Sequence, residues 1–224
     1  MSIDGYEILL LLHVLLFVYW LGADLAVLYS AGFAADPAVP IQARVVISRI
    51  MGFIDLFPRM SVPLIGAVGA TLAVMSGRLT LGAPGLVLVW FAAAVWVATN
   101  AWIYGYRQSP ERTLGWRRFD AWWRSAVALV AAMSGLLALL GHGITSDRSL
   151  AVKLLIFAAA IALSLLLRRL FGPYRPALAR LASGSASDSD NATMQRALSQ
   201  ARPVVLSIWA LTIAAAAIGL WRPL

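Results

Sequence analysis

Six long apolar runs, each close to the length that crosses a bilayer, constrain this chain more than any other feature of its sequence. A membrane-spanning helix needs about 20 apolar residues, because backbone groups in hydrocarbon must bond to one another within the helix. A soluble fold could not bury this much apolar surface, since 61% of the 224 residues are hydrophobic and only 12% are charged. The runs are residues 5–31, 58–76, 85–106, 125–141, 150–170 and 203–221. They predict an all-α, polytopic transmembrane helical bundle that forms one domain over residues 1–224.

Two segments between the spans predict helices or anchors at the membrane surface. Segment 41–57 alternates apolar residues with Arg44 and Arg49, a pattern typical of an amphipathic helix lying in the interface. Segment 116–124 mixes tryptophans with arginines, which is more typical of an interfacial anchor beside a span than of nucleic-acid binding.

The last connection predicts a loop and a short helix before the final span. Residues 183–190, with the sequence SGSASDSD, are polar and of low complexity, which predicts a mobile loop. Residues 191–201 follow as a short helix. Pro58 and Pro203 are placed at the starts of spans, where the missing N–H costs nothing.

The arginines are distributed unevenly between the two ends of the predicted spans. Fourteen flank the first, third and fifth connections, against three beside the second and fourth connections and the C-terminus. Basic residues are retained on the cytoplasmic side, so both termini are predicted to lie outside the cytoplasm of a bacterial-type inner membrane. The first run follows Asp4 and Glu7 instead of a basic flank, which favours a retained helix over a cleaved signal peptide.

Several classes of function are excluded or disfavoured. The sequence has no cysteine, so disulfides, thiolate metal sites and cysteine nucleophiles are excluded. It carries no P-loop, no glycine-rich dinucleotide fingerprint and no nucleophile elbow. Two histidines without cysteine also make a zinc or di-iron site improbable.

Ionisable residues inside a span are costly, and each is a functional hypothesis by default. His13 lies about two turns into the first span, and Trp20 follows on the same helical face. Lys153 is the only lysine of the chain and lies inside the fifth span. His142 ends the fourth span. The predicted topology places His13, His142 and Lys153 in the same outer third of the membrane.

These three side chains could ligate haem iron, because imidazole is a common axial ligand and a deprotonated amine can serve as well. The ligating pair is undecided among His13, Lys153 and His142, and aromatic residues such as Trp20 would shape the cofactor pocket. Structural alternatives stay open: a helix-to-helix hydrogen bond for His13, an interfacial position for His142, and snorkelling to the headgroups for Lys153.

Two further hypotheses concern an ion pair of Arg59 and the methionines as possible copper ligands. Asp24 and Arg59 could pair near the inner ends of the first two spans, or Asp55, one turn earlier, could be the partner of Arg59. Methionine sulfur suits Cu(I), but the methionines show no clustered motif, and core packing explains them more simply. They are Met51, Met60, Met75, Met133 and Met194.

Four short motifs resemble a known family. They are His13 to Trp20 with Gly22, the sequence Arg59-Met60-Ser61-Val62-Pro63, Lys153-Leu154, and Trp221-Arg222-Pro223. Together they look like the HemJ-type protoporphyrinogen oxidases and the related CopD-like membrane domains. The chain departs from that pattern where Ala151 and Val152 replace a histidine before the lysine, and where Asp24 appears late in the first helix. It therefore resembles a divergent member.

The resemblance implies a bundle carrying haem b, with His13 and Lys153 as the catalytically important pair. The implied reaction oxidises protoporphyrinogen to protoporphyrin and passes electrons to the membrane quinone pool or to a partner. Expected partners are the lipid bilayer, a porphyrin or quinone, and a second copy or another membrane subunit, but no nucleic acid. A CopD-like role in copper handling or transport and a non-catalytic subunit of a larger complex stay open as alternatives.

Overall fold

The computed structural model describes residues 4–107, 109–185 and 188–221 and folds them into eight helices. The helices are α1 Gly5–Ala35, α2 Ile41–Ile54, α3 Leu56–Met75, α4 Ala83–Gly105, α5 Pro110–Leu139, α6 Arg148–Leu170, α7 Tyr174–Ala182 and α8 Asp188–Trp221. The residues in these described ranges form no strand. The predicted all-α bundle is confirmed.

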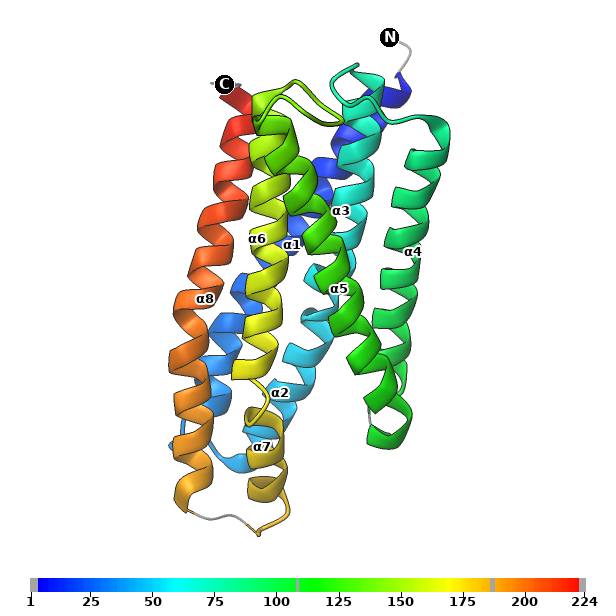
Figure 1. Cartoon of the computed structure of the whole chain (residues 1–224). Coiled ribbons are helices and arrows are strands. Elements are labelled where there is room, and N and C mark those ends of the chain that lie inside the picture. Colours follow the sequence, from blue (N-terminus) through cyan, green and yellow to red (C-terminus); the bar gives the residue numbers. More distant parts are fainter. Residues whose placement is uncertain (1–3, 108, 186–187, 222–224) are drawn as a thin grey trace.

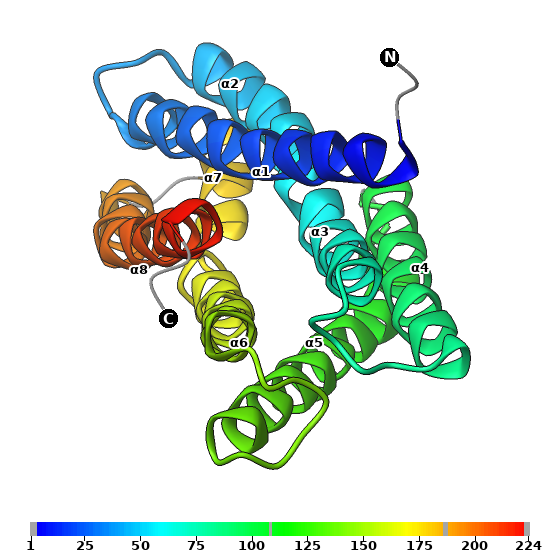
Figure 2. The same cartoon turned by 90° about the horizontal axis from the view of Figure 1, so that it is seen from above.

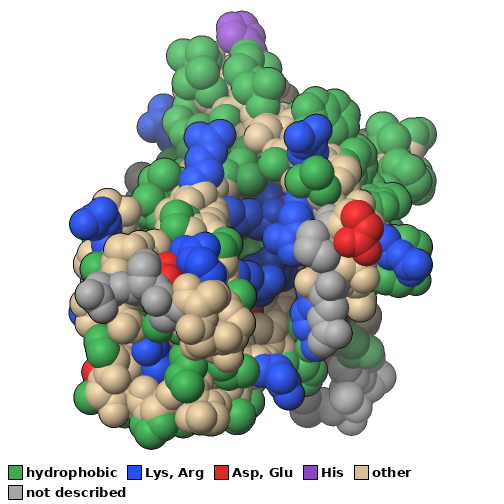
Figure 3. Space-filling model, turned by 90° about the horizontal axis from the view of Figure 1, so that it is seen from below, with side chains coloured by type: hydrophobic (Ala, Val, Ile, Leu, Met, Phe, Trp, Pro, Cys, Tyr) green, Lys and Arg blue, Asp and Glu red, His purple; other side chains and the backbone are tan. Residues whose placement is uncertain are grey.

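Six helical segments are long and apolar enough to cross a membrane, as the six apolar runs predicted. They run up and down, so the start of α1 and the end of α8 lie at one end of the molecule, together with the α3–α4 and α5–α6 connections (Figure 1). We name this the terminal end. The opposite end holds α2, α7 and the α4–α5 connection, and Figure 3 shows that Lys and Arg side chains gather there. We name it the arginine-rich end.

The six long helices form a closed ring. Each packs on two neighbours in the order α1, α3, α4, α5, α6, α8 and back to α1. Figure 2 shows this ring from above. Side chains on the inner faces of several helices can therefore meet at the centre, even where their helices do not pack on each other.

A buried apolar cluster holds the middle of the ring together. Trp20 of α1 and Trp96 of α4 are 8% and 2% exposed, and they belong to one cluster with residues of α3, α6 and α8. The other members are Val62, Ala160, Ile161 and Ile208. Two large indoles beside alanines let the helices approach closely while the space between them stays filled.

Pro58 lies in the first turn of α3, as the sequence predicted, but the expectation for Pro203 was wrong. The separate helix predicted over residues 191–201 does not end, and Pro203 lies inside the continuous helix α8. Packing explains the difference. The segment before Pro203 buries Met194, Ala197 and Leu198 against α1 and α7, so tertiary contact keeps the helix continuous where proline alone favours a break.

The predicted loop 183–190 is shorter in the structure. Residues 183–185 follow α7 as a turn, residues 186–187 lie outside the described residues, and α8 begins at Asp188. The fourth predicted span also began too late, since α5 continues the helix from Pro110 through the tryptophan and arginine segment. The helical backbone of α5 therefore begins before the apolar run from which the span was predicted.

Arg44 ties three helices together at the arginine-rich end. Its sequence context predicted a surface position, yet it is only 3% exposed. Its Nε donates to the carbonyl of Ala34 at 2.8 Å, and Nη1 donates to Asn191 Oδ1 at 2.9 Å. Nη2 donates to the sulfur of Met194 at 3.4 Å. Helix α2 is thereby fixed to α1 and α8.

The closest approach between α5 and α6 depends on Gly135. A Cβ at this position would lie 2.8 Å from the carbonyl oxygen of Ala151 and 3.0 Å from Leu155 Cγ. Because the first contact is with backbone, α5 and α6 would have to separate to admit any side chain.

We expect Gly135→Ala to lower the free energy of unfolding by about 1–3 kcal/mol, the usual cost of overpacking a close-packed site. The matched control is Gly115→Ala on the same helix, where an added Cβ meets nothing within 4 Å. Alanine there should leave stability unchanged or raise it by up to about 1 kcal/mol. The measurement is the temperature at which each detergent-solubilised variant loses its monodisperse gel-filtration peak. Equal temperatures for both variants would contradict the close contact.

Candidate functional site

His13 of α1 packs its ring against α3 at a glycine. A Cβ at Gly69 would lie 3.0 Å from His13 Cε1, so the absence of a side chain makes room for the imidazole. Phe157 of α6 uses the neighbouring gap, because a Cβ at Gly66 would lie 2.9 Å from its Cζ. These glycines are one helical turn apart and receive one side chain from α1 and one from α6.

One nitrogen of the His13 imidazole lacks a partner. Nδ1 is buried and has no hydrogen-bond partner in the part of the chain that the structure describes. The backbone of Ile65 in α3 interacts with the same ring. A buried polar atom left unsatisfied costs about 1–3 kcal/mol, so a group that bonds to this nitrogen would be favoured.

Lys153 of α6 lies close enough to interact electrostatically with His13. Its Nζ packs against α8, where a Cβ at Gly219 would lie 2.7 Å from that atom. His13 and Lys153 are thus close enough to interact electrostatically, and each lies beside a glycine of another helix. Helix α8 lies between α1 and α6 in the ring, so this interaction does not run through a packed α1–α6 interface.

His142 and Trp20 do not join this pair. His142 lies in the exposed turn after α5, between Gly141 and Gly143, and its backbone N–H donates to the carbonyl of Leu137 at 2.8 Å. Its side chain is exposed at the terminal end, so the expectation that it belongs to the ligand set finds no structural support. Trp20 lies deeper, in the central apolar cluster.

A buried ion cluster in the lower half of the ring was missed by the sequence reasoning. Asp120 of α5 is 0% exposed, and its carboxylate accepts from Arg124 Nε at 3.2 Å and from Arg168 of α6. Arg124 is 4% exposed. Its expected role as an interfacial anchor is therefore wrong, because the side chain points into the bundle and is paired there.

Arg124 extends the cluster to α4 and α6. Its guanidinium donates to Asn100 Oδ1 at 3.1 Å and to Ser164 Oγ at 3.5 Å, and it lies 5.0 Å above the ring of Trp96. Asn100 Nδ2 in turn donates to the backbone carbonyl of Arg59 at 3.0 Å. The polar contacts therefore run continuously through α3, α4, α5 and α6.

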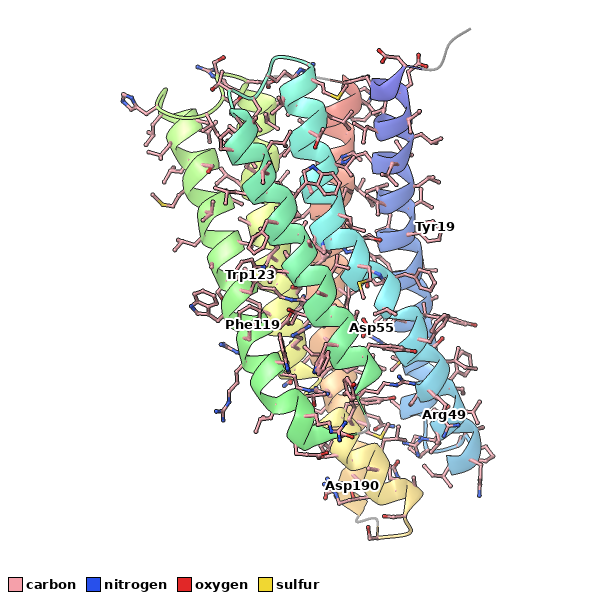
Figure 4. The ribbon with its side chains drawn as sticks, turned by 90° about the vertical axis from the view of Figure 1, so that its right-hand side faces the viewer. Tyr19, Arg49, Asp55, Phe119, Trp123 and Asp190 are labelled. Atoms are coloured by element: carbon pink, nitrogen blue, oxygen red, sulfur yellow. The ribbon has the colours of Figure 1, made fainter. Side chains whose placement is uncertain are left out.

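Arg59 pairs with Asp55, as one of the two sequence alternatives predicted. Asp24 of α1 interacts electrostatically with both residues. Figure 4 shows Asp55 in the lower half of the bundle at a level similar to that of Phe119. Phe119 and Trp123 stack along α5, with ring centroids 5.7 Å apart.

One local signal in the sequence could have indicated the cluster. Asp120 and Arg124 have the i,i+4 spacing of a helical ion pair, and Arg168 lies on the next long helix. Arginines close to span ends were all counted as orientation charges. Which of them turn inward depends on contacts between helices, and spacing within one helix does not specify those contacts.

The fold defines an all-α, multi-pass membrane protein with a histidine–lysine pair toward its terminal end and a buried ion cluster toward its arginine-rich end. No family model matches the chain, and neither a curated protein nor a solved structure matches it. The resemblance stated above is carried by the quoted residues alone. Among the described residues, no group of three or more His, Asp or Glu side chains is placed to hold a metal ion.

We expect Asp120→Asn to destabilise the protein by about 3–5 kcal/mol, because it leaves the charges of Arg124 and Arg168 buried without their carboxylate. The control is Glu111→Gln, an exposed position in the first turn of the same helix, where a change within about 0.5 kcal/mol is expected. Thermal denaturation of both variants in detergent measures the difference. A similar midpoint for the two would contradict the role assigned to the buried carboxylate.

Proposed function

We propose that the chain is a haem-b-binding integral membrane oxidoreductase in which His13 and Lys153 would hold the haem iron. The observation that carries the proposal is the unpartnered, buried Nδ1 of His13 beside Lys153 inside the ring. The motifs shared with HemJ-type proteins point to the same two residues.

The residues at this place fit haem by their chemistry. An imidazole nitrogen and a neutral amine are both competent ligands for iron, and they come from two helices that do not pack directly on each other. Gly69 and Gly219 leave the space that each ligand side chain occupies. When bound, haem supplies one-electron redox chemistry, and this chain's residues hold and orient it and exclude water from it.

The substrate class follows from the same resemblance and from the surroundings. A porphyrin or a quinone reaches a site inside a ring of apolar helices from the lipid phase, and electrons pass to the quinone pool or to a partner subunit. Copper handling has less support, because the described residues offer no clustered metal ligands and Met194 accepts a hydrogen bond from Arg44. A purely structural subunit is the remaining alternative.

The first test is an absorption spectrum of protein purified from membranes, oxidised and dithionite-reduced. We expect a Soret band in the wild type and its loss or shift in His13→Ala and in Lys153→Ala, since each removes one ligand. His142→Ala is the matched control and should keep the wild-type spectrum, because that side chain is exposed on the α5–α6 turn.

A wild-type protein that stays colourless after haem supplementation during expression would overturn the proposal. A spectrum that changes in His142→Ala but not in Lys153→Ala would assign the second ligand differently. If a Soret band is present, porphyrinogen and quinol oxidation become the activities to assay.

We also propose that the arginine-rich end faces the cytoplasm of a bacterial-type inner membrane, with both termini outside. The bias of arginines toward that end supports this orientation. The absence of cysteine from the sequence makes single-cysteine reporters unambiguous. Ser146→Cys lies in the α5–α6 connection and Ser183→Cys follows α7, and both positions are exposed.

In intact spheroplasts, a membrane-impermeant maleimide should label Ser146→Cys and should leave Ser183→Cys unlabelled until the membrane is opened by detergent. The expected difference arises because the reagent reaches only the outer face. The reverse labelling pattern would invert the orientation.

A further inference from the structure

The arginine-rich end is hollowed at its centre, and Lys and Arg side chains lie on the walls of the hollow (Figure 3). The only lysine of the chain belongs to the pair with His13, so arginines supply these walls. Six arginines at this end form an electrostatically linked set, in which Arg168 interacts with Arg124 and Arg59, and Arg175 interacts with Arg59, Arg117 and Arg107. They are Arg59 of α3, Arg107 after α4, Arg117 and Arg124 of α5, Arg168 of α6, and Arg175 of α7. We name this set the arginine recess.

The carboxylates beside the recess do not balance its charge. Asp55 pairs with Arg59, and Asp120 is shared between Arg124 and Arg168. Asp24 is the third acid that interacts with Arg59. Among the described residues, three carboxylates thus interact with a set of six guanidinium groups, and neighbouring like charges repel one another unless a counter-ion lies between them.

One donor in the recess is buried without an acceptor. Arg168 donates to Asp120, yet its second terminal nitrogen, Nη2, is buried and has no hydrogen-bond partner among residues 4–107, 109–185 and 188–221. A charged donor is among the most costly groups to leave unbonded. This buried donor is a second observation, independent of the charge excess, and it favours the binding of an anion that can accept its hydrogen bond.

The position of the recess relative to the membrane surface indicates the source of that anion. Trp102 and Trp116 are exposed on α4 and α5, close in sequence to Arg107 and Arg117, and their ring centroids are 5.8 Å apart. Exposed tryptophans of membrane proteins concentrate at the level of the lipid headgroups. The recess therefore opens where phosphate groups of lipids and of soluble compounds are both within reach.

We propose that the arginine recess is a binding site for a phosphate group. The guanidinium group of arginine binds two phosphate oxygens through a pair of parallel hydrogen bonds. A phosphate also offsets more of the positive charge of the recess than a single carboxylate would. The group can belong to an anionic phospholipid headgroup or to a soluble phosphate compound. This site does not depend on the haem proposal, because it uses none of the same residues.

The test compares neighbouring arginines on α5 in the purified full-length chain. Arg117→Gln removes a side chain that interacts with Arg175, whereas Arg118→Gln removes an exposed side chain about 100° away around the helix. Arg175→Gln is a second variant in the recess. All three side chains are exposed, so none of the substitutions leaves a buried charge unpaired, and Arg124 and Arg168 keep their carboxylate.

The thermal midpoint of each protein is measured in a neutral detergent in two titrations. One titrates inorganic phosphate against chloride of equal ionic strength, and the other titrates phosphatidylglycerol against phosphatidylcholine. We expect a saturable rise for the wild type and for Arg118→Gln. Arg117→Gln and Arg175→Gln should need about tenfold more ligand for the same rise, the equivalent of one charged hydrogen bond.

The two titrations distinguish the sources. A rise with inorganic phosphate identifies a soluble phosphate ligand, and a rise with phosphatidylglycerol alone identifies a lipid headgroup. No saturable rise in either titration, or an equal response in Arg117→Gln, Arg175→Gln and Arg118→Gln, would overturn the proposal.

Discussion

The buried carboxylate of Asp120 is the interaction on which the arrangement of the helices depends. It binds two guanidinium groups, one from its own helix and one from α6, and it is fully removed from solvent. Arg124 carries the connection to Asn100, which bonds to the backbone of α3 at Arg59. Charges buried away from water are costly unless every member is paired. Helices α3, α4, α5 and α6 therefore cannot shift independently without exposing one of these groups.

This constraint reaches the histidine–lysine pair through the same helices. Helix α6 carries Lys153 about four turns and Phe157 about three turns above Arg168, and α3 carries Gly66 and Gly69 above Arg59. Because the ion cluster holds α3 and α6 in a fixed position, it also fixes which side chain packs against each glycine of α3. These contacts are Phe157 at Gly66 and His13 at Gly69. The upper half contributes shape through small residues, and the lower half contributes directional polar contacts.

The sequence was sufficient for the number of membrane-spanning helices, because a run of apolar residues has one stable solution in lipid. Their ends were less predictable. The starts expected at Ser125 and Pro203 mark where the apolar runs begin, while α5 and α8 begin earlier in the chain as helix. His13 and Lys153 were candidates because ionisable residues are rare inside spans. Asp120, Arg124 and Arg168 were missed. An arginine near the end of a span can be a surface charge or part of an ion pair inside the bundle, and a single sequence does not distinguish the two.

Exposed arginines set the orientation of the chain in the membrane, whereas buried, paired arginines do not. The predicted orientation nevertheless stays the same when only the exposed arginines are counted. Five of the arginines toward the arginine-rich end make specific polar contacts and do not act as free surface charges; they are Arg44, Arg59, Arg124, Arg168 and Arg180. The others at that end are exposed; they are Arg49, Arg107, Arg112, Arg117, Arg118, Arg169, Arg175, Arg196 and Arg202. At the terminal end, Arg78 pairs with Asp147 at 3.6 Å and Arg148 is exposed. Orientation depends on charges that resist translocation, and the exposed arginines alone keep the bias. The paired arginines can therefore form contacts within the protein without changing the charge bias that sets its orientation.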